Sequence, residues 1–259
     1  MTLSGLAKLD LLAAACLLAG VSLCAQPIPA STAIPVVLTH SVAAGQAHPG
    51  DPVTAKTLQD VLLPGGRVLP RGTDLTGQVV ASTPFVFDAT PYAVQKPSVL
   101  SIRFDTIAAP GATIPVALDV RAVAGPVASH EAEIPHSLDE IDWSGTRILV
   151  GGESFSPLEK TVFSPDGGIA GYRRSQGIFA RLRAEGSVNP ESNFTCEATS
   201  SEQSVAIFSA NACGVYGIQS VFLAQNGSPD GASLSLASLR RSVRLYAGTT
   251  ALLQVISPQ

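Results

Sequence analysis

The chain has 259 residues, of which 46% are hydrophobic and only 14% are charged, and its formal net charge is −4. A nucleic-acid-binding surface is normally strongly basic, so this balance argues against nucleic acid as a partner. The 23 glycines and 19 prolines indicate many turns, as in β-sandwiches and barrels, and argue against a helical bundle.

The N-terminal 25 residues predict a signal peptide that is removed on export. Lys8 precedes an uncharged apolar run over residues 11–23. This run is shorter than the about 20 residues of a membrane-spanning helix, and it has the length typical of the apolar centre of a signal peptide. Ala25 supplies the small residue at the cleavage site, so we expect the mature chain to begin at Gln26.

Two alternatives remain open for this segment. In the first, Cys24 carries a lipid anchor, although lipoprotein signals have Gly, Ala or Ser where this chain has Leu23. In the second, the whole segment is retained as an anchor. No later apolar run reaches membrane-spanning length, so no membrane span is expected after cleavage. We therefore expect an exported protein that is periplasmic, associated with the outer envelope or secreted.

The rest of the chain divides into four parts by composition. Residues 26–52 are rich in Pro, Ala, Ser and Gly and predict a linker or a loosely held first strand. Residues 53–125 predict a β-barrel-like module, residues 126–144 an exposed polar loop, and residues 145–259 a second β region that includes a closing strand. The expected fold class is all-β, a mostly antiparallel barrel or sandwich in which the two regions share one sheet.

Apolar and polar residues alternate most clearly over residues 100–105 and 114–121, which is typical of strands with one buried face. Pro110-Gly111 lies between them and favours an antiparallel pair. A helical turn is expected within residues 137–141, and a short helix over residues 232–241. Further strands are expected over residues 147–150, 161–163, 169–172, 178–182, 205–208, 219–223, 243–246 and 251–256, with 164–168 as a hairpin turn.

Two cysteines remain in the mature chain, Cys196 and Cys213. In an oxidising compartment, two cysteines suggest one disulfide. The loop between them is short, so the bridge would stabilise the fold by about 3 kcal/mol in the chain-entropy model. The alternative is a pair of buried free thiols. A zinc site is not favoured, because no histidine lies near this pair in the sequence.

The densest group of potentially reactive side chains lies over residues 130–136, with two histidines and two glutamates. The helical zinc signature places two histidines four residues apart on one face. Here His130 and His136 are six apart, and Pro135 disfavours a regular helix. We interpret the segment as a solvated acidic loop and expect no metal site.

No catalytic or cofactor-binding residue is expected. No serine lies in a Gly-x-Ser-x-Gly elbow, and since His40 and His48 fall in the predicted linker, a Ser-His-Asp triad would depend on His130 or His136. One tryptophan and four tyrosines are few for stacking sugar rings. Some carboxylates could be paired for glycoside hydrolysis, but we interpret them as scattered surface acids. They are Asp139, Glu140, Asp142, Glu153 and Glu159.

Residues 69–79 read Leu-Pro-Arg-Gly-Thr-Asp-Leu-Thr-Gly-Gln-Val. Pro70 and Gly72 predict a tight turn that ends at Thr73, and Gly77 relieves crowding inside the following strand. The segment resembles the Pro-x-Gly-Ser/Thr-x-Leu-x-Gly-x-Val motif of the TrbI-like β-domain, which belongs to outer-membrane channel components of type IV secretion and conjugation. The resemblance implies a shared β-barrel-like module.

Other segments extend this resemblance. Residues 100–107 and the following Pro110-Gly111 look like the next strand and turn of the family, and residues 243–255 look like a closing strand. Residues 166–177 and 212–217 resemble parts of uncharacterised secreted bacterial proteins. These similarities indicate a structural module and name no reaction.

The sequence therefore predicts a non-catalytic exported envelope or assembly protein, which acts through contacts with other envelope proteins or through self-association. A secreted ligand- or glycan-binding β module is the first alternative, and a secreted hydrolase is the second.

Overall fold

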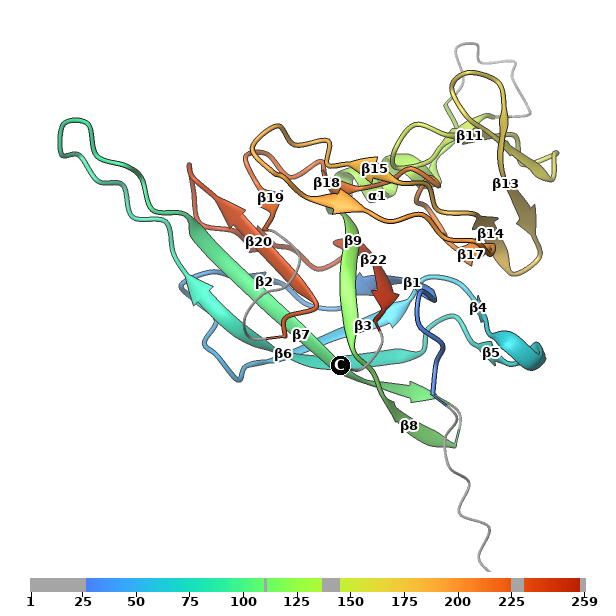
Figure 1. The fold of residues 1–259 in the computed structure, drawn as a ribbon, viewed down its shortest axis with the longest axis horizontal. Coiled ribbons are helices and arrows are strands. Elements are labelled where there is room, and N and C mark those ends of the chain that lie inside the picture. Colours follow the sequence, from blue (N-terminus) through green and yellow to red (C-terminus); the bar gives the residue numbers. More distant parts are fainter. Residues whose placement is uncertain (1–26, 110, 137–144, 225–230, 257–259) are drawn as a thin grey trace, which may run out of the picture.

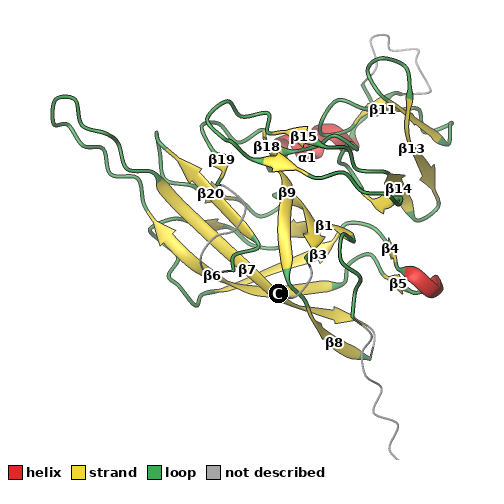
Figure 2. Cartoon of the chain, viewed as in Figure 1, coloured by secondary structure: helices red, strands yellow, loops and turns green. Residues whose placement is uncertain are grey.

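The computed structural model describes residues 27–109, 111–136, 145–224 and 231–256. Throughout these ranges, most elements are strands joined by turns and loops (Figure 2). The strands form several sheets with mainly antiparallel neighbours and no closed barrel. The predicted all-β, mostly antiparallel class is therefore confirmed, in its sandwich-like form.

Strands from both halves of the chain build the largest sheet (Figure 1). One neighbouring pair in it is parallel, formed by residues 214–216 with 122–124, and the other pairs are antiparallel. The predicted sharing of one sheet by the two regions is confirmed. From edge to edge the strands are β18 (Gly214–Tyr216), β9 (Leu118–Ala124), β22 (Thr250–Val255), β1 (Ala33–Leu38), β3 (Pro52–Thr57), β6 (Asp74–Thr83), β7 (Ser98–Ala109), β20 (Leu234–Ser238) and β19 (Phe222–Leu223), with β8 (Ala112–Pro115) beside β7.

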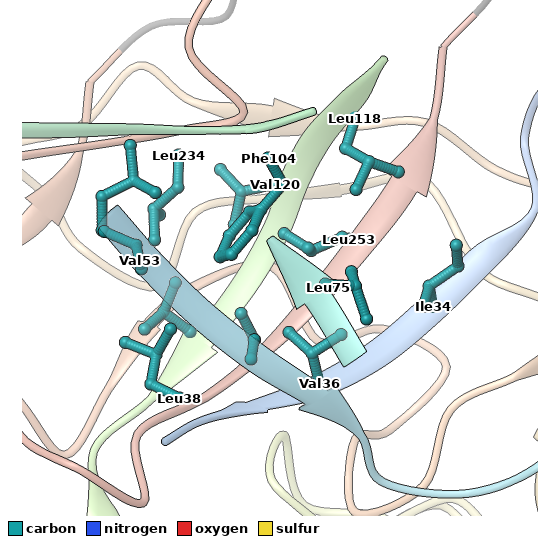
Figure 3. Close-up of a cluster of buried hydrophobic side chains, with 14 of the residues drawn as sticks. Ile34, Val36, Leu38, Val53, Leu75, Phe104, Leu118, Val120, Leu234 and Leu253 are labelled. Atoms are coloured by element: carbon teal, nitrogen blue, oxygen red, sulfur yellow. The ribbon is translucent and has the colours of Figure 1, made fainter. Parts of the chain in front are cut away.

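The alternation of apolar and polar residues along the strands determines which face of this sheet is buried. Leu100, Ile102 and Phe104 of β7 are buried, as alternate residues of a strand with one covered face should be. Figure 3 shows Phe104 among side chains from other strands, including Val53 of β3 and Leu253 of β22. This first core is a cluster of apolar side chains, and Ser98 and Ser101 of β7 are also buried in the sheet.

A second core lies on the other side of three neighbouring strands, β9, β22 and β1. Val123 of β9 belongs to the first core, whereas its neighbour Ala122 belongs to the second. In the same way, Leu253 of β22 belongs to the first core and Leu252 belongs to the second. Successive side chains of a strand point to opposite faces. These three strands are therefore buried on both sides, and they lie between the two cores.

The remaining elements are shorter. The helix and the six-stranded sheet contribute to the second core, whereas the three two-stranded pairs contribute to the first. The helix α1 (Pro126–Glu133) follows β9, and a 3-10 turn, η1 (Pro64–Gly66), follows β4. A six-stranded sheet has the order β10 (Arg147–Ile148), β11 (Ser154–Phe155), β12 (Thr161–Phe163), β13 (Ile169–Arg174), β14 (Gly177–Ala180) and β17 (Gln203–Ser204). Three two-stranded pairs complete the fold: β15 (Glu185–Gly186) with β16 (Thr195–Cys196), β2 (Val42–Ala43) with β21 (Arg244–Leu245), and β4 (Val61–Leu62) with β5 (Val68–Leu69).

Four local expectations differ from the structure. The strand expected over residues 205–208 is wrong, because the chain turns there and only Phe208 forms an isolated bridge, with Val150. The linker expected over residues 26–52 contains β1, which lies inside the sheet between β22 and β3 because its apolar residues face both cores. The loop expected over residues 126–144 begins with α1, which Pro126 starts at its first turn. The helix expected over residues 232–241 is wrong: β20 pairs there with β7. The turn expected within residues 137–141 lies outside the described residues.

A buried arginine connects the large sheet to the second region, by which we mean α1, the six-stranded sheet and the loops that pack on the second core. Arg121 is the extra residue of a β-bulge in β9, because Val120 pairs with Leu253 and Ala122 with Leu252. Its side chain is 1% exposed and donates hydrogen bonds to four backbone carbonyls. Burial lowers the pKa of Arg121 to about 10, so the guanidinium stays charged at neutral pH. The four acceptors are the carbonyls of Ala212 at 3.0 Å, Glu197 at 2.5 Å, Ala210 at 3.2 Å, and Arg183.

A buried glutamate holds a neighbouring loop. Glu153 is 1% exposed, and its Oε2 accepts a hydrogen bond of 2.9 Å from the Ala210 amide. Its own amide donates to the Ser209 hydroxyl at 3.0 Å. The second carboxylate oxygen, Oε1, is buried without a hydrogen-bond partner. Burial raises the pKa of Glu153, because a low-dielectric surrounding disfavours the charged carboxylate.

Candidate functional site

Two surfaces of the molecule have features that the fold itself does not require. The first is an arm formed by residues 84–97, which joins β6 to β7. Figure 1 shows the arm extending from the body at the upper left, beyond the ends of both strands. No strand is assigned within residues 84–97, so no ladder of backbone hydrogen bonds runs through it.

The arm carries large apolar side chains in water. Four of them have exposed fractions between 69% and 104%, namely Val86, Phe87, Tyr92 and Val94. Neither core contains any residue of the arm. Scattered apolar side chains on a surface are ordinary, but a contiguous group on one projecting segment is typical of an interaction site.

Hydrogen bonds order the arm at its tip. The Gln95 side chain donates to the Asp88 carbonyl at 2.9 Å and accepts from the Asp88 amide at 3.0 Å, which ties the two limbs together. Hydrogen bonds from the Thr90 hydroxyl and amide lower the pKa of the Asp88 carboxyl. At the root, the Phe85 amide donates to the Ser242 hydroxyl at 3.0 Å.

The second surface is a cavity of about 430 Å³ between the large sheet and the second region. Its wall is formed by segments that lie far apart in the sequence. Gln59, which is 5% exposed, closes one side by pairing with β14: its side chain donates to the Ile178 carbonyl and accepts from the Ile178 amide, both at 2.9 Å. The charged lining residues are Arg71, Arg147, Arg173, Arg174, Asp60 and Glu133, and the apolar ones include Leu58, Leu149, Phe155, Ile178 and Ile207.

The predicted disulfide between Cys196 and Cys213 is present, with Cα atoms 6.0 Å apart. Both cysteines are buried against the first core. The bridge ties β16 to the segment just before β18, next to the carbonyls that Arg121 binds. The predicted cleavage site at Ala25 and Gln26 lies outside the described residues.

The turn motif has the local geometry that its residues favour. Gly72 has φ +80°, a left-handed conformation that glycine adopts without strain. The Thr73 hydroxyl donates to the Pro70 carbonyl at 2.6 Å, and the Gly72 amide donates to the Thr57 carbonyl at 2.9 Å. The turn therefore connects β5 to β6.

Gly77 lies where β6 and β7 come closest. A Cβ atom there would be 2.1 Å from the Arg103 carbonyl oxygen and 2.7 Å from the Phe104 Cα. The register between the strands also shifts at this point, between Thr76 and Gly77. The motif thus serves strand packing, and its residues line no part of the arm.

The histidines and acids singled out in the sequence form no reaction centre among the described residues. His136 forms an isolated β-bridge with Thr146, and its ring nitrogen lies 3.3 Å from the Glu131 carbonyl oxygen. Glu153 is buried, with its amide on the Ser209 hydroxyl, whereas Glu159 is exposed. No group of three His, Cys, Asp or Glu side chains in the described ranges is placed to hold a metal ion. Asp139, Glu140 and Asp142 lie outside those ranges.

Comparison with known proteins adds no relative. No family model, no curated protein and no solved structure matches the chain. Within the described ranges, no helix is long and apolar enough to cross a membrane.

Sequence reasoning missed both surfaces. The Phe85-Val86-Phe87 run between Pro84 and Pro91 was the available signal for the arm, since apolar residues in a proline-bounded segment have no strand in which to be buried. The cavity had no local signal, because its arginines come from three separate segments.

Proposed function

We propose that this chain is an exported, non-catalytic protein of the cell envelope, which joins an assembly by docking its arm, residues 84–97, on a protein partner. The observation that carries the proposal is the group of four apolar side chains on the arm, outside both cores. Removing a large apolar side chain from water is worth about 1.5–3 kcal/mol, so a partner that covers the arm gains binding energy from each of them.

The internal order of the arm favours binding. The hydrogen bonds between Asp88 and Gln95, and those from Thr90 to Asp88, hold the tip in one conformation. A segment that is already ordered loses less conformational entropy when it docks. The arm is therefore suited to act as a preformed plug for a groove.

The backbone of the arm favours a protein partner over the interior of a bilayer. Because no strand ladder runs through residues 84–97, most of its backbone groups depend on water or on a partner for hydrogen bonds. Hydrocarbon offers none, and each unsatisfied group costs several kcal/mol there. A partner with an apolar groove beside a free strand edge can cover the side chains and pair the backbone together.

Export is supported by the predicted signal peptide and by the disulfide. Lys8 and the apolar run over residues 11–23 are typical of a secretory signal. Disulfides persist in oxidising compartments, and Cys196 and Cys213 are bridged. The resemblance to the TrbI-like β-domain points to the same setting, an assembly in the envelope.

Photo-crosslinking in the host envelope tests the docking. A photoreactive p-benzoylphenylalanine replaces Val94 on the arm or, as the matched control, Leu158, which is also apolar and exposed but lies outside the arm. We expect one discrete protein adduct from position 94 and none of that mass from position 158. Changing Val86, Phe87 and Tyr92 to Ser in the same chain should abolish the adduct without lowering the melting temperature.

The mass of the adduct identifies the occupant. An adduct of twice the chain's own mass identifies a second copy as the partner, and an adduct of any other protein identifies a different envelope component. Lipid adducts alone, or equal adducts from positions 94 and 158, would overturn protein docking by the arm.

A further inference from the structure

The cavity between the two regions has an unusual supply of positive charge. Its wall contains four arginines and two carboxylates, Asp60 and Glu133. Only one of the arginines, Arg174, has an ion-pair partner in the described part of the chain: it pairs at 2.5 Å with Glu202 and also lies over the Phe179 ring. Arg71, Arg147 and Arg173 have no carboxylate of the described residues within ion-pair distance.

Arg147 supplies the second observation. Its Nε is buried, and it has no hydrogen-bond partner. A buried polar atom without a partner costs about 1–3 kcal/mol, and a charged donor costs more. A buried polar atom without a partner calls for an explanation, and in a cavity wall a bound ligand would supply one.

The other two arginines complete a cationic wall. Arg173 is held in place by the carbonyls of Pro157 and Glu159, so its side chain is positioned without being neutralised. The side chain of Arg71, in the turn before β6, forms no hydrogen bond or ion pair with the described residues, whereas its amide donates to the Asp60 carboxylate at 2.8 Å. Arg71 therefore remains free to turn toward a ligand.

The rest of the wall is apolar. Leu149 and Phe155 come from the second region, and Leu58 comes from the end of β3. A volume of about 430 Å³ falls within the range of sites for small molecules. Guanidinium groups match carboxylates with two parallel hydrogen bonds, and apolar walls accept a hydrocarbon body.

We propose that this cavity binds a small amphipathic carboxylate, with Arg147 and Arg71 on its acidic group and the side chains of Leu149 and Phe155 on its apolar body. The site is separate from the arm, so the inference does not rest on the proposed function. It adds a ligand-binding activity to a protein whose other surface docks on a partner.

The test uses the fluorescent anion 8-anilinonaphthalene-1-sulfonate as the probe on the mature chain, with octanoate as the competitor. We expect saturable binding of one probe, displaced by octanoate and not by octylamine, which has the same apolar body and the opposite charge. Arg147→Gln should weaken octanoate binding about tenfold, the loss expected for a charge-assisted hydrogen bond. Arg71→Gln should weaken it less, and it removes no hydrogen bond or ion pair to the described residues.

Two controls separate the site from the rest of the surface. Arg240→Gln removes an exposed arginine outside the cavity and should leave octanoate binding unchanged. The chain with Val86, Phe87 and Tyr92 changed to Ser should also bind octanoate normally, which distinguishes this site from the arm. Displacement by octylamine, or unchanged octanoate affinity in both Arg147→Gln and Arg71→Gln, would overturn the proposal.

Discussion

The two regions of the molecule are held together by different interactions. The large sheet has strands of up to 12 residues, and its core is built mainly from aliphatic side chains, with Phe104, Phe194 and the Cys196–Cys213 bridge. The second region has strands of two to six residues, and polar groups are buried around it: Arg121, Glu153 and Ser209 are each 1% exposed or less.

The difference follows from where the backbone finds its hydrogen bonds. A long strand satisfies its amides and carbonyls through the neighbouring strands, so its core can be purely apolar. Short strands and loops leave carbonyls without partners, and a buried chain must satisfy them with side chains. Arg121 does this for four carbonyls at once, and Glu153 does it for the Ala210 amide.

The largest expected effect comes from removing the guanidinium of Arg121. Arg121→Met fills the space with an apolar chain but leaves four buried carbonyls without a donor, so we expect a loss of about 3–5 kcal/mol in the free energy of unfolding. Hydrogen exchange should show lost protection over residues 182–212 while β6 and β7 stay protected. Arg181→Met, which removes an exposed arginine from the same region, should change stability by about 0.5 kcal/mol or less.

A uniform loss of protection in Arg121→Met would contradict this difference between the large sheet and the second region, because it would mean that the two unfold as one unit.

An intermediate effect is expected at Gly77 in the large sheet. Gly77→Ala places a Cβ atom 2.1 Å from a backbone oxygen of β7, which cannot move without shifting the strand. We expect a loss of about 1–3 kcal/mol, measured by denaturant unfolding. Gly186→Ala is the matched control, because a Cβ atom at that position of β15 meets nothing within 4 Å. Equal losses in the two variants would contradict the close approach of β6 and β7.

The smallest effect is expected at Glu153 and depends on pH. A carboxyl whose pKa is raised in the folded state stabilises the protein below its unfolded pKa of about 4.3, and this contribution is lost as the pH rises through the folded pKa. Glu153→Gln keeps an acceptor for the Ala210 amide but has no charge to bury. The free energy of unfolding of this variant, relative to that of the native chain, should therefore rise between pH 4 and pH 8, by about 1 kcal/mol or less. Melting temperatures of both chains across this pH range measure the difference. A constant difference across this range would exclude a raised pKa.

Local patterns were sufficient where a strand's burial repeats along its own sequence. Residues 100–105 alternate, and β7 forms there with Leu100, Ile102 and Phe104 buried. Residues 232–241 were predicted wrongly because Leu234 and Leu236 fit both a strand and one side of a short helix. Pairing with β7 decided between them, and that pairing joins residues more than a hundred positions apart.

The same limit applies to Arg121 and to both candidate sites. The alternation over residues 114–121 predicts Arg121 on the solvent side of its strand, but a β-bulge and the covering loops enclose it. The arm is contiguous in sequence, yet only the ends of β6 and β7 show that it leaves the body. The cavity assembles Arg71, Arg147 and Arg173 from three separate segments.

Local sequence patterns were enough to predict the β class, the strands with clear alternation and the Cys196–Cys213 bridge. These depend on local periodicity and on the presence of only two cysteines after the predicted signal. Contacts between distant segments were needed to bring β1 into the sheet and to bury Arg121. They also bring into one cavity three arginines that have no ion-pair partner among the described residues. Each of these depends on contacts between distant segments, whose free energy is gained only when the chain is folded.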